Sequence, residues 1–155
     1  MNAIPQILST DFVDAALAVP NKKVLFQQLA TAVGRRTGYD SKTILASLNE
    51  REKLGSTGFG SGVAIPHGKL DELPHVLGYF ARLTAPIDFQ AVDGLPVDLV
   101  FMLLSPTDAG ADHLKALAGV SRLLRDRQMA AKLRGARSND AMFALLAGVE
   151  ALDAA

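Results

Sequence analysis

The sequence predicts an α/β protein, a three-layer α/β/α sandwich around a central mixed sheet. Apolar residues recur with helical periodicity at both ends of the 155-residue chain, and extended apolar segments fill its middle. Helices that precede and follow a block of strands can cover both faces of one sheet. We therefore expect a single domain over residues 1–155, with its core from about residue 7 to 149.

The N-terminal region contains two predicted helices. Apolar residues at four-residue spacing follow Asn21, which predicts a helix capped by Asn21 and ended by Gly38. Asp40 or Ser41 caps a second helix, which we expect to run to about residue 53.

Three strand-like segments follow, over residues 63–65, 76–83 and 97–104. The third is almost continuously apolar, which is typical of a central strand covered on both faces. We expect turn-rich connections at residues 85–89 and 92–96. From about Ala109 the chain is predicted to be helical, and Ser138 caps a last helix.

Composition and charge exclude several classes of function. The 16 basic and 16 acidic residues balance, so no global field favours nucleic acid or anionic membrane. Basic residues gather between Arg122 and Arg137, but Asp126 interrupts them, and we predict a solvated helix face there. Cysteine is absent, which excludes disulfides and thiolate chemistry. With no signal-peptide layout and no long apolar run, we expect a cytoplasmic protein without direct membrane insertion.

A glycine-rich segment, residues 55–69, is the strongest functional signal in the sequence. Its glycines and hydroxyl residues expose backbone N–H groups, which is how proteins build concave anion sites. His67 lies between Pro66 and Gly68, so a defined backbone geometry places its ring. The segment fits neither the Walker spacing nor GxGxxG, and the histidine spacings fit no zinc pattern. We therefore expect phosphate chemistry without nucleotide or metal.

Three side chains in or near this segment could act on a phosphate. His67 could simply end a strand, but neutral imidazole is nucleophilic at cytoplasmic pH, and the flanking glycines favour a reactive role. His113 is either a buried histidine on an apolar helix face or a phosphate contact at a helix start. Arg51 is either a packed stem with a solvated head or a donor fork for phosphate. We interpret His75 as an exposed bystander.

Two segments carry a resemblance to a known family: Arg51-Glu52-Lys53-Leu54-Gly55-Ser56-Thr57-Gly58 and Ala64-Ile65-Pro66-His67-Gly68-Lys69. They resemble the enzyme IIA domains of the phosphoenolpyruvate phosphotransferase system, fructose/mannitol superfamily, and within it the nitrogen-regulatory branch (IIA-Ntr). Further matches lie between residues 86 and 101 and at His113, so the resemblance covers nearly the whole chain. Ser61 departs from the family's asparagine, and Phe59 replaces an aliphatic residue.

The resemblance implies a phosphocarrier with an α/β/α fold and no cofactor or metal. His67 then accepts a phosphoryl group as tele-phosphohistidine from a phosphohistidine carrier, HPr or its nitrogen-branch counterpart NPr. His113 is the second histidine that contacts the phosphorylated ring, and Arg51 stabilises the phosphate charge. The implied phosphate-binding loop comprises Ser56, Thr57, Gly58 and Gly68.

Three functions remain open on this resemblance. The first is a nitrogen-type regulator whose partners, such as potassium transporters or sensor kinases, read its phosphorylation state. The alternative is a fructose- or mannitol-specific IIA protein that passes phosphate to a separate IIB component. The third is a non-catalytic binding module on the same fold, which the presence of His67 disfavours.

Overall fold

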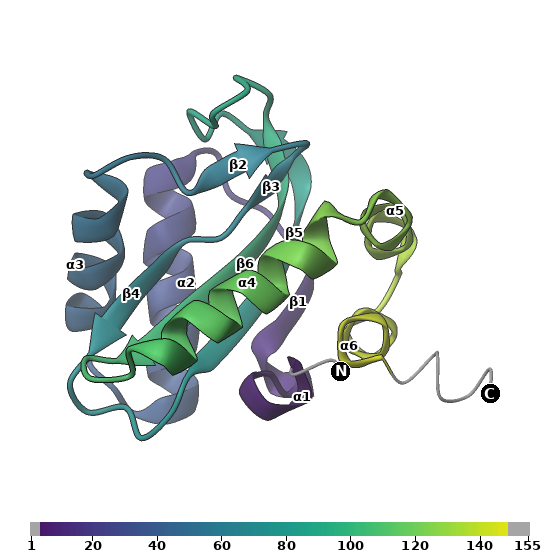
Figure 1. Ribbon diagram of the computed structural model, residues 1–155. Helices are drawn as coiled ribbons and strands as arrows, with labels where there is room; N and C mark the ends of the chain where they lie inside the picture. Colours follow the sequence, from purple (N-terminus) through teal and green to yellow (C-terminus); the bar gives the residue numbers. More distant parts are fainter. Residues whose placement is uncertain (1–3, 149–155) are drawn as a thin grey trace.

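In the computed structural model, which describes residues 4–148, one mixed sheet lies between two helical layers (Figure 1). One face is covered by α2 (Lys22–Thr37) and α3 (Ser41–Glu52). The other face is covered by α1 (Ile4–Ile7), α4 (Ala111–Arg125), α5 (Arg127–Gly135) and α6 (Asn139–Ala147). The predicted three-layer sandwich is confirmed. Residue 149, where we expect the core to end, lies outside the described residues.

The sheet is built around its longest apolar strand. A short 3-10 turn, Thr10–Phe12, leads into the first strand. The strands are β1 (Val13–Leu17), β2 (Gly58–Gly60), β3 (Val63–Ala64), β4 (His67–Leu70), β5 (Leu77–Ile87) and β6 (Val97–Pro106). The order is β1-β5-β6-β3-β2, and β4 also pairs with β6. β6 runs antiparallel to β5 but parallel to both β3 and β4.

Side chains of β6 alternate between two separate cores, as a strand's period of two requires. Val100, Met102 and Leu104 pack with α2 and α3. Leu99, Phe101 and Leu103 pack with the helices of the opposite layer. The predicted central strand covered on both faces is confirmed.

The local signals for helix ends agree with the structure. The side chain of Asn21 accepts the Val24 N–H at 2.9 Å and so caps α2. Gly38 ends that helix with φ of 82°, a left-handed conformation that glycine adopts without a steric penalty. Ser138 caps α6 through a 3.0 Å bond from the Ala141 N–H.

Several expectations about single elements were wrong. Residues 85–89 were expected to form a turn, but β5 continues through Pro86 to Ile87. The short strands β1, β2 and β4 were not predicted. The helical stretch between residues 122 and 137 divides at Asp126, whose carboxylate accepts the Gln128 and Met129 N–H groups and so starts α5.

Candidate functional site

His67 is the first residue of β4, beside the middle of the sheet. β3 pairs with the first half of β6, and the chain then breaks its pairing at Ile65 and Pro66. The Leu103 N–H donates to the Pro66 carbonyl at 2.9 Å, and His67 then pairs with Leu103. The backbone of His67 is therefore held by the most buried strand of the protein.

The imidazole of His67 has a defined tautomer. Its Nδ1 lies 2.8 Å from the carbonyl oxygen of Ile65. Because a carbonyl only accepts hydrogen bonds, Nδ1 carries the ring proton and Nε2 is unprotonated, with its lone pair available. Nε2 is thus the nucleophilic nitrogen of a half-buried ring.

Arg51 extends from the last turn of α3 to this nitrogen. Its Nε donates to Nε2 of His67 at 3.2 Å, and its Nη1 donates to the Gly55 carbonyl at 2.8 Å. The guanidinium is therefore hydrogen-bonded to His67 and to the loop, an arrangement that agrees with the expected donor fork. A planar donor with several N–H groups beside a nucleophilic nitrogen can bind an oxyanion that arrives there.

His113, in the first turn of α4, is brought to His67 from a distant part of the chain. The two ring centroids are 5.4 Å apart and the ring planes are inclined by 49°. His113 Nδ1 lies 2.5 Å from the hydroxyl oxygen of Ser105, at the end of β6. His113 is half-buried and lies beside the other histidine, rather than deep in the apolar core.

Both histidines are held neutral near pH 7. Burial lowers the pKa of His67 below its ordinary 6.5, and the charge of Arg51 lowers it further, against the opposing effects of the Ile65 carbonyl and Glu52. Burial also lowers the pKa of His113, with smaller contributions in the same direction from His67 and Lys69. A neutral His67 is the form that can act as a nucleophile.

The glycine-rich loop is held by a carboxylate that the sequence patterns did not single out. Glu52 accepts the N–H of Thr57 at 2.9 Å and its hydroxyl at 2.6 Å. The hydroxyl of Ser56 donates to the Phe89 carbonyl at 3.4 Å and accepts the Gly58 N–H at 3.1 Å. The hydroxyl protons of Ser56 and Thr57 are therefore donated to protein oxygens in this structure.

Lys22, at the start of α2, completes this support. Its Nζ lies 2.7 Å from the Glu52 carboxylate, donates to the Phe89 carbonyl at 3.1 Å and sits 4.4 Å from the centre of the Phe89 ring. The side chains of the pair are only 21% and 9% exposed. Glu52 follows Arg51 directly at the end of a predicted helix, and this position is the one sequence signal that could have pointed to it.

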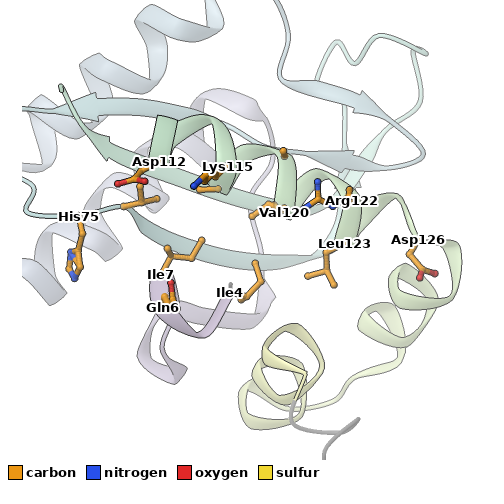
Figure 2. A pocket seen from close by; sticks show the side chains of 14 residues that line it. Ile4, Gln6, Ile7, His75, Asp112, Lys115, Val120, Arg122, Leu123 and Asp126 are labelled. Carbon is orange, nitrogen blue, oxygen red and sulfur yellow. The ribbon is translucent and has the colours of Figure 1, made fainter. Parts of the chain in front are cut away.

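A cavity of about 800 Å³ lies along α4, but it is not this site. Figure 2 shows it between α1 and α4, with His75 at one end, Asp126 at the other, and Ile4, Ile7 and Val120 on its walls. Its lining includes none of His67, His113 and Arg51. His75 is exposed and takes no part in the two-histidine site, as expected.

Residues 4–148 hold neither a membrane-spanning helix nor a metal-binding cluster. No helix there has both the length and the apolar character needed to cross a bilayer. No three or more His, Cys, Asp or Glu side chains in this range gather so that they could hold a metal ion.

Two histidines and an arginine thus come together at the start of β4, on a mixed sheet that lies between two helical layers. The sequence profile of the family described as "Phosphoenolpyruvate-dependent sugar phosphotransferase system, EIIA 2" matches residues 6–148. The chain therefore belongs to this family, and the predicted resemblance is confirmed.

Within the family the chain is similar to nitrogen-regulatory members. A nitrogen regulatory protein of Bradyrhizobium diazoefficiens is 50% identical over 144 residues, which span 93% of this chain and 94% of the relative. The crystal structure of nitrogen regulatory protein IIA-Ntr from Neisseria meningitidis superposes with a TM-score of 0.88 at 34% identity, covering 94% of this chain and 99% of that one.

A more distant structure shows the fold alone. It is the Escherichia coli mannitol IIA enzyme in complex with its phosphorylated IIB enzyme. The TM-score is 0.77 at 19% identity, with 91% of this chain and 97% of that chain covered.

Proposed function

We propose that this protein is a phosphocarrier that accepts a phosphoryl group on Nε2 of His67 and signals through its phosphorylation state. One observation carries the proposal. The Ile65 carbonyl holds the proton of His67 on Nδ1, so that the Nε2 lone pair faces Arg51 and lies beside His113. A positioned lone pair next to cationic and N–H donors is the arrangement that nucleophilic phosphoryl acceptance requires.

The transfer itself needs only alignment and charge stabilisation. The P–N bond of a phosphohistidine on the donor breaks as a P–N bond to Nε2 of His67 forms. The electron pair of the broken bond stays on the donor nitrogen, and the ring proton of His67 stays on Nδ1, hydrogen-bonded to the Ile65 carbonyl. Because the bonds broken and formed are alike, the protein mainly has to orient His67 and stabilise the three phosphoryl oxygens.

Arg51 and His113 mainly stabilise the charge of those oxygens. The Nε–H group of Arg51 donates to Nε2 of His67 before transfer, and it can donate to a phosphoryl oxygen once the group is bound there. The N–H groups of Thr57 and Gly58 are already bonded to Glu52 and Ser56, so in this proposal they shape the loop around the phosphoryl group. Gly68 acts in the same way, because it lies buried in β4 next to His67.

We assign HPr or NPr as the donor and regulatory proteins as the readers. The 50% identity to a nitrogen regulatory protein supports the regulatory assignment. Leu54 and Leu114 are 84% and 65% exposed and adjoin, in sequence, the loop and His113, so apolar surface for a docking protein lies beside the site. Phosphotransfer with such carriers places the protein in the cytoplasm.

Radiolabelled phosphoenolpyruvate with enzyme I and either HPr or NPr tests this function. The wild type should become labelled, His67→Ala should not, and His75→Ala should be labelled like the wild type because His75 lies outside the site. Equal labelling of wild type and His67→Ala would overturn the site assignment.

The same experiment separates the other two functions. Label that moves on to a fructose- or mannitol-specific IIB protein would favour the sugar-specific alternative. A wild type that takes no label from either carrier would favour the non-catalytic module.

A further inference from the structure

Ser105 is a buried polar residue that the proposed chemistry does not yet use. It has 0% of its surface exposed, although it lies at the end of β6 where the strand approaches the site. Its strand partner on β4 is Lys69, two residues after His67. Its hydroxyl oxygen lies 2.5 Å from Nδ1 of His113.

The direction of this hydrogen bond follows from counting protons. A hydroxyl group can donate or accept, and a neutral imidazole nitrogen can do either, depending on its tautomer. Within residues 4–148, His113 Nδ1 is the sole hydrogen-bond partner of the Ser105 hydroxyl. If Nδ1 carried the proton and donated to Ser105, the buried hydroxyl proton would have no acceptor, which costs about 1 to 3 kcal/mol. The hydroxyl therefore donates to Nδ1.

The two histidines then have opposite tautomers. In His67 the proton is on Nδ1, because its partner there is a carbonyl that only accepts. In His113 the proton is on Nε2, because Nδ1 receives the serine proton. One ring thus offers a lone pair and the other an N–H donor, with ring centroids 5.4 Å apart.

We propose that Ser105 is a positioning residue that fixes His113 as its Nε2–H tautomer, so that this N–H can donate to a phosphoryl group on Nε2 of His67. The inference deepens the proposed function and rests on it for the identity of the group. In the unphosphorylated protein burial lowers the pKa of His113, so an arriving phosphoryl group meets a neutral ring whose tautomer decides whether it presents a donor or a lone pair. A lone pair there would repel them.

The tautomer can be measured without any phosphoryl transfer. Long-range ¹H–¹⁵N spectra of protein labelled in histidine, recorded at pH 8, distinguish a protonated from an unprotonated ring nitrogen. We expect the wild type to show Nε2–H at His113 and Nδ1–H at His67. Ser105→Thr should keep this pattern, whereas Ser105→Ala should give His113 mixed tautomers and leave His67 unchanged. Nδ1–H at His113 in the wild type, or an unchanged spectrum in Ser105→Ala, would overturn the role of Ser105.

The effect of Ser105 on phosphoryl transfer is measured by the initial rate at which the protein is labelled from the phosphorylated carrier. We expect Ser105→Ala to be slowed about three- to tenfold, the effect of one lost hydrogen bond, and Ser105→Thr to be close to the wild type. In a His113→Ala background, Ser105→Ala should slow the reaction no further, because the serine acts through the ring.

Failure of the Ser105 proposal and failure of the proposed function give different results. An additional slowing by Ser105→Ala in the His113→Ala background, or no slowing in either, contradicts positioning through His113. A wild type that takes no label overturns the proposed function, while the spectrum still decides the tautomer.

Discussion

Ser47 lies so close to Gly68 that a β-carbon on residue 68 would sit 2.3 Å from its hydroxyl oxygen. Gly68 does not adopt a left-handed φ, so the absence of a side chain, rather than backbone freedom, is what this position requires. The close approach lets α3 pack directly on β4. It thereby sets the distance between Arg51 on the helix and His67 on the strand.

Gly68→Ala should lower the free energy of unfolding by about 1 to 3 kcal/mol, because α3 must move away from β4. Urea denaturation measures the loss. Gly119→Ala is a matched control, since no atom lies within 4 Å of its missing β-carbon on α4. That variant should instead gain about 0.5 to 1 kcal/mol, from the better helix propensity of alanine. A Gly68→Ala protein as stable as the wild type would contradict the packing account.

Arg51→Met should raise the pKa of His67, because the guanidinium charge lowers it and methionine removes that charge. Histidine titration by NMR measures the change in the unphosphorylated protein. The same variant should accept phosphoryl groups about 100-fold more slowly, as expected when a donor to a developing charge is lost. An unchanged titration would show that Arg51 does not act electrostatically on the ring.

The free energy of unfolding should decrease as the pH is lowered, because both site histidines have pKa values below the 6.5 of the unfolded chain. Above pH 6.5 both states are neutral and the contribution is fully present. As the pH falls, the unfolded chain takes up protons first, so the folded state loses stability through 6.5 down to the lowered values. Urea unfolding at pH 7 and pH 5 should show this loss. It should shrink in a His67→Gln/His113→Gln variant, and an equal loss there would assign it to other groups.

Thr57→Val should cost about 1 to 2 kcal/mol, because Glu52 loses its hydroxyl donor in a part-buried site. Thr43 donates to the Asp40 carboxylate at 2.8 Å on the exposed surface of α3 and is the matched control. Thr43→Val should change the free energy of unfolding by less than about 0.5 kcal/mol. Equal costs for the two variants would mean that burial at Glu52 adds nothing to the hydrogen bond.

Ser61 has φ of 59°, a left-handed conformation, at the turn between β2 and β3. Asparagine, the residue expected there from the family resemblance, tolerates this region better than other residues with a β-carbon. Ser61→Asn should therefore raise the free energy of unfolding by about 0.5 to 1 kcal/mol. Ser61→Ala keeps the same strain and should gain nothing. Thermal denaturation of both variants tests the difference.

The sequence predicts α2 and α6 well because their ends carry local signals. Asn21, Gly38 and Ser138 act within a few residues of themselves, so no knowledge of the fold is needed to interpret them. The central strand was predicted for a similar reason, since its apolar run is continuous over residues 97–104.

The unpredicted short strands β2 and β4 carry no such signal. β2 has three residues and β4 has four, too few for any alternation to be visible. β4 exists because it pairs with β6, which lies more than thirty residues further along the chain. Pro86 misled the prediction because proline usually ends a strand, whereas here the extended chain simply continues to Ile87.

The sequence predicted which residues lie in the candidate site, but not which atoms of those residues contact one another. Spacing places Arg51 and His113 on the inward faces of helices and leaves their roles open. The tertiary contacts decide what the guanidinium and the second ring touch. Ser105 carries a weak signal, as a polar residue at the end of the apolar run of β6, but its partner lies on another element.

The contact between Ser47 and β4 has a consequence for association. Among the described strands β4 pairs only with β6, so its other side is an edge that a strand from another molecule could extend. There the Ser47 hydroxyl accepts the Lys69 N–H at 2.8 Å and donates to the Lys69 carbonyl at 2.9 Å. One helix side chain thus occupies both backbone groups of Lys69, so a strand from another molecule could not pair with them at this point of the edge.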